Sequence, residues 1–498
     1  MVKEILSGGH TFREYALLPN LTKPESHISK VSLETKLTGN IVLRNPFLSA
    51  AMQSVTNYEM ALELGKQGGM GVLPVGLKVE EQSEIVRKIK EYEMSFVEDP
   101  VTAKENETIE GVLRKIEIYG HSRIPIVDEY KTLLGMFTLK HYVEMESKPN
   151  IQNPVTTAMI LFSNDIPPLD LNADIPYCKD CDISVKDVEK LFRPNDKSNG
   201  KKDNVQRYLV VIDKQNRIRK LAFKRDTETI PIASAISTYR GWRKRVEKNI
   251  KAGVDLIVID TSDAHNVYTR NLIKEYKSMN VRTPICAGNV VTYVGAMYLM
   301  KAGADIIKVG MSSGSMCTTK PQKGVGRAPM TALIEVDKAR QEYFKKEGRY
   351  IPLIMDGGVS TAADVIIALS IADVVMMGYY FNRFFEAAGE KFDEDGNITR
   401  DETKMKFVEI YGEGSKKGLN LLRYDHSPLT FYEQGVVGKV PYEGRLKPFL
   451  KSDLEKIKDA LSNTGCRNLE EFRKKAVIEL NSPEAYRDLD TTFKIITN

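Results

Sequence analysis

Three stretches of the chain share one pattern: KAGVDLIVID (251–260), KAGADIIKVG (301–310) and SIADVVMMG (370–378). In each stretch the end of a helical segment is followed by a tight turn and then by an apolar run, typical of a strand buried on both faces. Gly253 and Gly303 stand where a helix closes with a left-handed residue. A repeat of helix, turn and buried strand predicts an α/β fold with a parallel sheet.

Further apolar runs of the same kind extend this pattern along the chain. Segments of helical period separate most of them, as in 240–253, 269–279 and 292–303. We predict a (β/α)₈ barrel, because the alternative, an open doubly wound sheet, rarely has eight equivalent strands. The eight expected strands are PFLSAAM (46–52), GVLPV (71–75), PIASAI (231–236), DLIVIDTS (255–262), PICAGN (284–289), DIIKVG (305–310), IPLIMDGG (351–358) and DVVMMG (373–378).

The pattern breaks between the second and third strands, where residues 96–225 are more polar. Two similar pieces lie there, 122–141 and 206–226, and each has the pattern strand, Asp-led turn, strand. They resemble a tandem pair of the small regulatory modules named after cystathionine β-synthase (CBS), inserted in a barrel loop. An unrelated α+β insertion is the alternative. We therefore expect a barrel in two parts, 1–95 and 226–498, around the insertion.

The composition excludes several classes of protein. The chain has 498 residues, and its formal net charge of +5 is too small for a general nucleic-acid binder. Five cysteines cannot form a disulfide framework, and their odd number favours a reducing compartment, so we expect a cytoplasmic protein. No apolar run approaches the roughly 18 residues of a membrane span.

Candidate functional residues follow the strands, because barrels carry their sites at the carboxyl ends of the strands. Glycine-bearing turns after strands six to eight predict a phosphate site built from backbone N–H groups, and so a phosphorylated ligand. Cys317 lies in the polar loop GMSSGSMCTTK (310–320) and is either a nucleophile or an inert loop thiol. Cys286, inside a strand, is expected in the core, and CKDC (178–181) is too isolated for a zinc site.

A segment near the C-terminus, 410–444, is rich in Gly, Lys and aromatic residues and poor in regular periodicity. We interpret it as a long functional loop or lid, part of a mobile flap over about 400–445.

Several motifs taken together carry a family resemblance: HTFREYALLPN (10–20), SAAMQSVT (49–56), AGNVVT (287–292), GSMCTT (314–319), QKGVGR (322–327), DGGV (356–359), YGEGS (411–415) and VPYEG (440–444). With them the chain resembles the inosine 5′-monophosphate (IMP) dehydrogenases and their sister family, the guanosine 5′-monophosphate (GMP) reductases. The resemblance covers nearly the whole chain.

The resemblance implies oxidation of IMP to xanthosine 5′-monophosphate (XMP) with NAD⁺, in guanine nucleotide biosynthesis. The thiolate of Cys317 would add to carbon 2 of the purine, and water would hydrolyse the resulting thioimidate. The implied catalytic residues are Cys317, Thr319, Arg423, Tyr424 and Gln434. Those implied for the substrate are Ser315, Asp356, Gly357, Gly358, Gly378, Tyr411, Glu413 and Gly414, and those for the cofactor are Asp260, Ser262 and Asn289.

The resemblance also implies a homotetramer, a regulatory adenine or guanine nucleotide at the inserted modules, and no membrane or specific nucleic-acid partner. A potassium ion would be held by the backbone carbonyls of Gly310, Ser312 and Cys317. Ser312 stands where the family usually has Gly, and the C-terminal residues 479–498 contain no Glu-Gly-Gly segment, so this site departs from the family pattern.

Two further functions remain open. One is a GMP reductase, which uses the same cysteine with NADPH and releases ammonia. The flap with Arg423 and Tyr424 favours the dehydrogenase, because a reductase needs no water activation. The other is a catalytically silent sensor of purine nucleotides.

Overall fold

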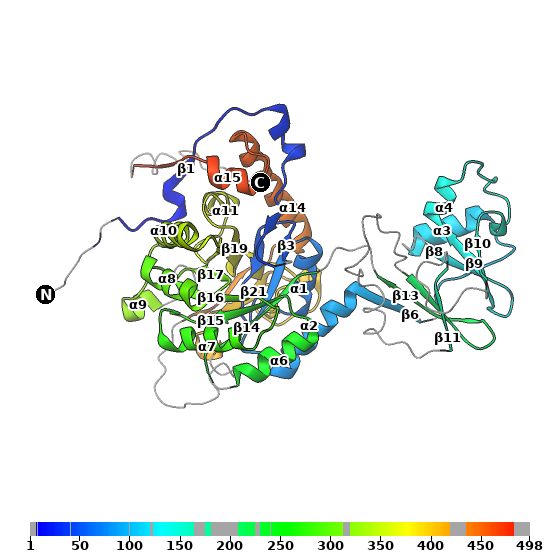
Figure 1. Cartoon of the computed structure of the whole chain (residues 1–498), viewed down its shortest axis with the longest axis horizontal. Helices are drawn as coiled ribbons and strands as arrows, with labels where there is room; N and C mark the ends of the chain where they lie inside the picture. Colours follow the sequence, from blue (N-terminus) through cyan, green and yellow to red (C-terminus); the bar gives the residue numbers. More distant parts are fainter. Residues whose placement is uncertain are drawn as a thin grey trace. The chain divides into compact units, whose positions relative to one another are not determined.

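The structure is a computed structural model that describes residues 6, 8–39, 41–98, 100–119, 123–163, 175–180, 208–224, 230–239, 241–311, 319–418 and 435–482. The chain forms two compact units (Figure 1). The first unit comprises Met1–Ile89 and Ile230–Asn498, and the second comprises Lys90–Thr229.

The first unit contains a closed barrel of eight parallel strands, which confirms the (β/α)₈ prediction over the open sheet. Each expected apolar run supplies one strand, and the last strand pairs with the first. In order around the barrel the strands are β4 (Phe47–Ser49), β5 (Met70–Leu73), β14 (Ile232–Ile236), β15 (Leu256–Asp260), β16 (Ile285–Val290), β17 (Ile306–Val309), β18 (Leu353–Asp356) and β19 (Val374–Met377).

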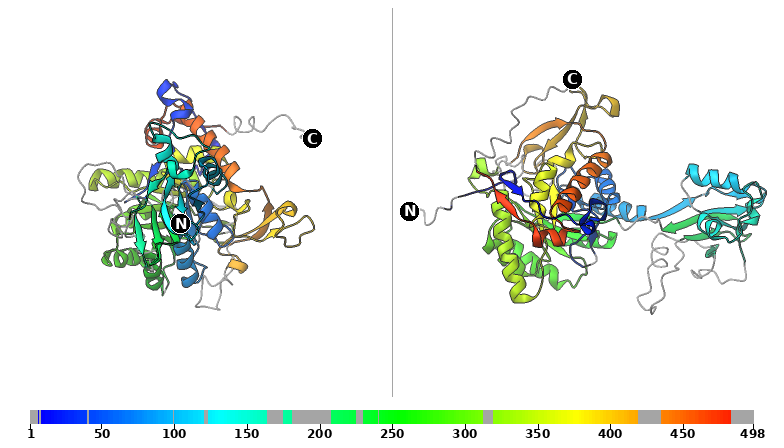
Figure 2. Two further views of the ribbon diagram at one scale, coloured as in Figure 1. Left: turned by 90° about the vertical axis from the view of Figure 1, so that its right-hand side faces the viewer. Right: turned by 90° about the horizontal axis from the view of Figure 1, so that it is seen from above.

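Helices surround the barrel, as the two views of Figure 2 show. Local signals delimit several of them. The Asn266 side chain caps α7 (Val267–Ser278) by accepting from Thr269 N–H, and Gly253 and Gly303 end α6 (Trp242–Ala252) and α8 (Tyr293–Ala302) with φ of +97° and +105°. The helices of this unit include α1 (Tyr58–Lys66), α2 (Val79–Glu93, whose last residues enter the second unit), α6 (Trp242–Ala252), α7 (Val267–Ser278), α8 (Tyr293–Ala302), α9 (Thr319–Lys323), α10 (Pro329–Glu347), α11 (Ala362–Leu369), α12 (Tyr379–Asn382), α13 (Lys416–Gly418), α14 (Leu446–Asn463) and α15 (Leu469–Lys475).

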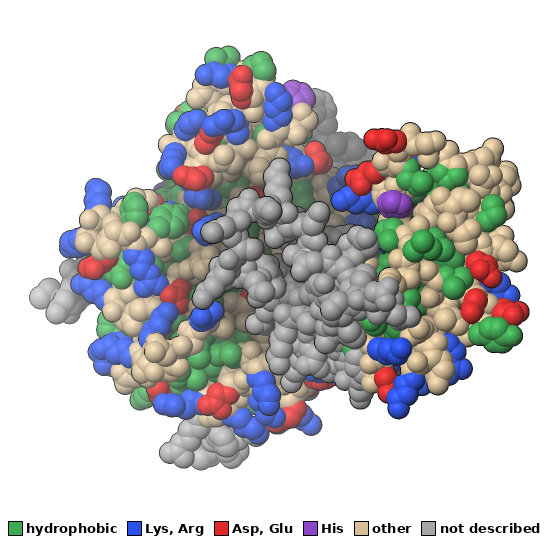
Figure 3. Space-filling view, turned by 45° about the vertical axis from the view of Figure 1, so that its right-hand side comes forward, with side chains coloured by type: hydrophobic (Ala, Val, Ile, Leu, Met, Phe, Trp, Pro, Cys, Tyr) green, Lys and Arg blue, Asp and Glu red, His purple; other side chains and the backbone are tan. Residues whose placement is uncertain are grey.

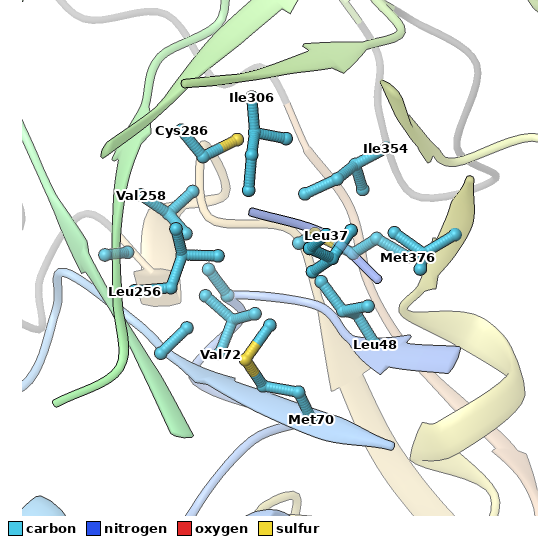
Figure 4. Packing of buried hydrophobic residues seen from close by; sticks show 14 of the residues in the cluster. Leu37, Leu48, Met70, Val72, Leu256, Val258, Cys286, Ile306, Ile354 and Met376 are labelled. Atoms are coloured by element: carbon cyan, nitrogen blue, oxygen red, sulfur yellow. The ribbon is translucent and has the colours of Figure 1, made fainter. Parts of the chain in front are cut away.

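Inward-facing side chains fill the barrel, as Figure 4 shows for Val258, Cys286, Ile306 and Ile354. The hairpin of β2 (Thr35–Lys36) and β3 (Val42–Leu43) adds Leu37, Ile41 and Leu43 to the same cluster. Alternate residues of a strand face the same side. The inward positions that follow the apolar ones on β15, β17 and β18 are therefore Asp260, Lys308 and Asp356.

A small antiparallel sheet lies after the barrel strands in sequence and contains β20 (Lys391–Phe392), β21 (Phe407–Tyr411) and β22 (Val437–Pro441). The interpretation of 410–444 as a loop is therefore wrong at its ends, because Tyr411 pairs with Val437 and Phe407 with Pro441. Polar and glycine residues obscure the alternation of β22. Residues 419–434, in the middle of the expected flap, lie outside the described residues. A further two-stranded pair joins β1 (Tyr15–Leu17) to β23 (Ile478–Leu480).

The second unit contains two four-stranded sheets. The order of strands in the first is β10 (Ile160–Leu161), β9 (Leu133–Thr138), β8 (Arg123–Val127) and β7 (Ala103–Lys104), and in the second it is β11 (Tyr177–Lys179), β12 (Tyr208–Ile212), β13 (Ile218–Lys224) and β6 (Met94–Glu98). In each, a parallel neighbour precedes an antiparallel hairpin, and another antiparallel strand lies on its far side. The helices among the described residues of this unit include α3 (Ile109–Tyr119) and α4 (Leu139–Glu144).

The two central hairpins of this unit turn in the same way. Asp128 accepts the N–H groups of Tyr130 and Thr132, and Asp213 accepts those of Gln215 and Arg217. A left-handed residue follows in each turn, at Lys131 and Asn216, and the two turns hydrogen-bond to each other through Leu133 N–H to the Asn216 carbonyl and Ile218 N–H to the Lys131 carbonyl. The repeat expected from the Asp-led turns is therefore also a structural repeat.

Basic and acidic side chains are interspersed on the face shown in Figure 3, without a continuous area of either sign. This distribution agrees with the near balance of charge in the sequence. Within the described part of the chain, no helix combines the length and the apolar character that crossing a bilayer requires.

Candidate active site at the barrel mouth

A cluster of polar side chains lies at the carboxyl ends of four consecutive strands. The ammonium of Lys308, on β17, donates to Asp260 Oδ1 of β15 at 3.0 Å and to Asp356 Oδ2 of β18 at 2.8 Å. It also donates to the amide oxygen of Asn289 on β16. Asn289 in turn donates through Nδ2 to Asp356 Oδ2 at 2.9 Å. The predicted residues Asp260, Asn289 and Asp356 are thus brought together, and Lys308 joins them.

Lys308 is sealed inside the barrel, with 1% of the residue exposed. Burial disfavours its charged form, but Asp356 and Asp260 outweigh that penalty and raise the pKa of the Lys308 ammonium. The lysine therefore stays protonated through the physiological range. Sequence reasoning missed it, although a lone lysine within the apolar run DIIKVG was a signal that could have identified it.

Gly288 makes room for this lysine. A Cβ atom on Gly288, in the neighbouring strand, would lie 2.4 Å from the Cβ of Lys308 and 2.5 Å from its carbonyl oxygen. Strands β16 and β17 pair here, with Gly288 opposite Lys308. A side chain at 288 would thus push against the backbone that carries the ammonium.

Glycine turns follow the last strands, as expected for a phosphate site. Gly357 and Gly358 have φ of +79° and +74°, a conformation that glycine adopts without strain. They lead into α11, whose N-cap Thr361 accepts from Asp364 N–H at 3.2 Å. Gly378, after β19, leaves room for Met52, since a Cβ there would lie 2.8 Å from the methionine sulfur. The turn at Gly357 and Gly358, just before the N-terminus of α11 (Ala362–Leu369), has the backbone setting that suits an anion.

A second polar contact joins the loop after β4 to the residues after β21. Glu413 accepts from the backbone N–H of Gln53 at 2.6 Å and from its Nε2 at 3.1 Å. The buried Ser54 donates to the carbonyl of Tyr411 and accepts from its N–H. Burial, with a smaller effect of the nearby Glu413 carboxylate, raises the pKa of Tyr411. These contacts place Tyr411 and Glu413 beside the loop that follows the first barrel strand, and Gly414 is the next residue in the chain. Gln53 is a second residue that sequence reasoning missed.

The structure places the other predicted residues as follows. Ser262 is exposed after β15. Gly310 directly follows β17 and donates its N–H to the carbonyl of Val290 at 3.2 Å, and Thr319 begins α9. Ser312, Ser315, Cys317, Arg423, Tyr424 and Gln434 lie outside the described residues.

Cys286 lies in the barrel core, which confirms the interpretation of this residue. It is fully buried, and burial raises the pKa of its thiol to about 12. The thiol is therefore protonated at neutral pH and unsuited to nucleophilic attack. Among the described residues, no group of three or more His, Cys, Asp or Glu side chains could hold a metal ion.

Comparison with known proteins now identifies the family. A sequence profile described as "IMP dehydrogenase / GMP reductase domain" matches residues 9–490. The chain belongs to the IMP dehydrogenase / GMP reductase family. It is 31% identical to an inosine-5′-monophosphate dehydrogenase of Tritrichomonas foetus, over 95% of this chain and 93% of that protein. It is also 31% identical to that of Schizosaccharomyces pombe, over 98% of this chain and 93% of that protein.

A solved structure of similar fold is a GMP reductase of Trypanosoma brucei, determined in complex with guanosine 5′-monophosphate. The two chains superpose with a TM-score of 0.68 at 21% identity, covering 98% of each. This likeness supports the barrel fold. The family membership confirms the resemblance carried by the sequence motifs and makes the chain a member of a family of oxidoreductases.

Proposed function

We propose that the protein is an IMP dehydrogenase that oxidises IMP to XMP with NAD⁺. The observation that carries this proposal is the cluster of Asp356, Asn289 and Asp260 at the mouth of the barrel, in a chain that is 31% identical to two IMP dehydrogenases over 95% and 98% of its length. A carboxylate accepts hydrogen bonds from the hydroxyls of a ribose, and Asp356 and Asp260 would offer one carboxylate to each of the two riboses, that of IMP and that of the nicotinamide. The glycine turn after Asp356 fits the 5′-phosphate of the nucleotide.

The chemistry proposed for Cys317 proceeds in two steps. Its thiolate adds to carbon 2 of the purine, and the tetrahedral carbon then loses hydride to NAD⁺, which leaves a thioimidate. Water adds to the same carbon, the bond to sulfur breaks, and XMP leaves with the thiol regenerated. The sum is IMP, NAD⁺ and water giving XMP, NADH and a proton. When bound, NAD⁺ supplies only the hydride acceptor.

The residues of the chain that would act around this centre divide into three groups. Asp356 would hold the ribose of IMP, with Ser315, Gly357, Gly358 and Gly378 around the phosphate, and Tyr411, Glu413 and Gly414 along the base. Asp260, Ser262 and Asn289 would hold the nicotinamide ribose. For hydrolysis we assign water activation to Arg423, assisted by Thr319, Tyr424 and Gln434. Because the pKa of arginine is above about 12, this role requires a desolvated environment.

Other proposals concern the whole protein. The matching turns at Asp128 and Asp213 support a tandem pair of CBS-like modules within Lys90–Thr229, which would bind an adenine or guanine nucleotide. We further propose a homotetramer in the cytoplasm, in keeping with the cysteine content. We derive no step through potassium, since Gly310 is the one member of its expected ligand set within the described residues.

A GMP reductase is the second candidate, supported by the solved reductase of similar fold. The decisive experiment incubates the purified protein with IMP and NAD⁺, and separately with GMP and NADPH, while absorbance follows the reduced cofactor. Formation of NADH with IMP supports the dehydrogenase. Consumption of NADPH with GMP would replace it by the reductase, and activity in neither assay would favour a silent sensor.

A further inference from the structure

We propose that Lys308 is a positioning residue shared by the two nucleotide sites: its single ammonium holds both the carboxylate assigned to the substrate ribose and the one assigned to the cofactor ribose. This inference rests on the proposed function, because it takes the roles of Asp356 and Asp260 from there. The inference adds Lys308 to the site, and it implies that binding of the substrate and binding of the cofactor depend on this one residue.

The geometry of the ammonium supports a shared role. A lysine ammonium has three N–H donors, and Lys308 has three acceptors on three different strands: Asp260, Asn289 and Asp356. Asn289 and Lys308 both donate to Oδ2 of Asp356, so the orientation of this carboxylate is defined by two contacts. All three N–H donors of the ammonium therefore have an acceptor within the protein before any ligand binds.

The side chain of Lys308 is less exposed to solvent than the side chains of the two aspartates that it contacts. The side chain of Lys308 is 2% exposed, whereas those of Asp260 and Asp356 are 16% and 22% exposed. The carboxylates can therefore meet a ligand from the barrel mouth, while the lysine lies behind them against the apolar core. Lys308 would act on a ligand through these carboxylates and not by contact.

The negative charges of Asp260 and Asp356 make the two nucleotide sites depend on the same ammonium. Asp260 Oδ1 and Asp356 Oδ2 lie 3.0 and 2.8 Å from one nitrogen. They therefore lie within about 6 Å of each other, a separation at which two negative charges repel each other. Without the ammonium, the two carboxylates would repel each other and turn away from their present positions. Loss of Lys308 should therefore weaken both sites together.

The test compares Lys308→Met, which has a similar length without charge, with Lys308→Arg. We expect Lys308→Met to raise KM for IMP and KM for NAD⁺ each by about 10-fold or more, with a smaller change in kcat, because the three acceptors of Lys308 are residues assigned to the two riboses and not to the reacting centre. Lys308→Arg should recover part of both KM values. A merely structural role would lower stability and the amount of active enzyme without moving the two KM values.

Lys277→Met is the matched control. Lys277 also pairs with an aspartate of the barrel, Asp305 at 2.6 Å, but at the amino end of β17 instead of the carboxyl end. This variant should leave both KM values unchanged. If it shifted them as strongly as Lys308→Met, the effect would be one of general stability and the proposal would be wrong.

A double variant keeps the proposal testable if Lys308→Met does not fold. Lys308→Met combined with Asp260→Asn removes one of the two like charges, so it should fold even where Lys308→Met does not, and where both variants fold it should bind IMP more tightly than Lys308→Met. Binding of IMP and of NAD⁺ is measured by calorimetry, without turnover. A double variant that does not fold, or one that binds IMP no more tightly than a folded Lys308→Met variant, would contradict the repulsion argument.

The outcomes distinguish this inference from the function on which it rests. The wild-type protein is assayed first, and its failure to turn over IMP with NAD⁺ would refute the proposed function. An active wild type whose Lys308→Met variant moves one KM alone, or neither, would refute the shared role while leaving the function standing. A fall in kcat of about 100-fold at unchanged KM would instead place Lys308 in the chemistry.

Discussion

Replacing Gly288 by alanine tests the packing that gives Lys308 its place. The added Cβ would lie 2.4 Å from Lys308 Cβ, 2.5 Å from its carbonyl oxygen and 3.0 Å from its Cα. None of these atoms is the end of a flexible side chain, so the backbone of β16 or β17 must shift. Overpacking of this kind costs about 1–3 kcal/mol. We expect a loss of that size in the free energy of unfolding, together with higher KM values for both nucleotides.

The assay uses the one tryptophan of the chain, Trp242, at the start of α6 in the barrel unit. Its fluorescence during urea unfolding reports the stability of the barrel. Gly438→Ala is the control, because a Cβ at Gly438 in β22 meets nothing within 4 Å and the residue has no left-handed φ. That variant should stay within about 0.5 kcal/mol of the wild type. A Gly288→Ala protein with wild-type stability and wild-type KM values would refute the packing argument.

Three further predictions concern the chemistry and the insertion. Cys317→Ala should abolish turnover yet still bind IMP in a calorimeter, whereas Cys286→Ala should lower stability by about 1–3 kcal/mol and keep activity; appreciable turnover without Cys317 would exclude covalent catalysis there. Arg423→Ala should give a burst of NADH about equal to the active sites, then slow turnover, with the adduct on Cys317 seen by intact-protein mass spectrometry; a slowed burst without adduct would reject water activation by this arginine. A Gly/Ser linker in place of residues 96–225 should preserve turnover, because β5 and β14 pair directly; a folded but inactive product would show that the insertion contributes to the active site.

The sequence by itself determined the barrel and the ends of several of its helices, because buried strands and helix ends have local sequence patterns. A run such as DLIVID has the composition of a strand buried on both faces wherever it stands, and Gly253 and Gly303 close their helices because few other residues adopt a left-handed conformation without strain. Residues at strand ends, such as Asp260 and Asp356, could be assigned to the mouth by the same reasoning. The motifs around Cys317 indicated the family to which the chain belongs.

Only the tertiary structure decided which of these residues meet. Lys308 stands in an apolar run, where its neighbours in sequence predict only burial, and its three partners come from three strands that closure of the barrel brings together. Gln53 and Glu413 are 360 positions apart, so no local pattern could pair them. The strands β21 and β22 were missed because each is stabilised by its partner across a long connection rather than by its own alternation. Contacts of this kind depend on the closed barrel. Bringing distant segments together costs conformational entropy, and folding of the barrel offsets this cost before any such contact forms.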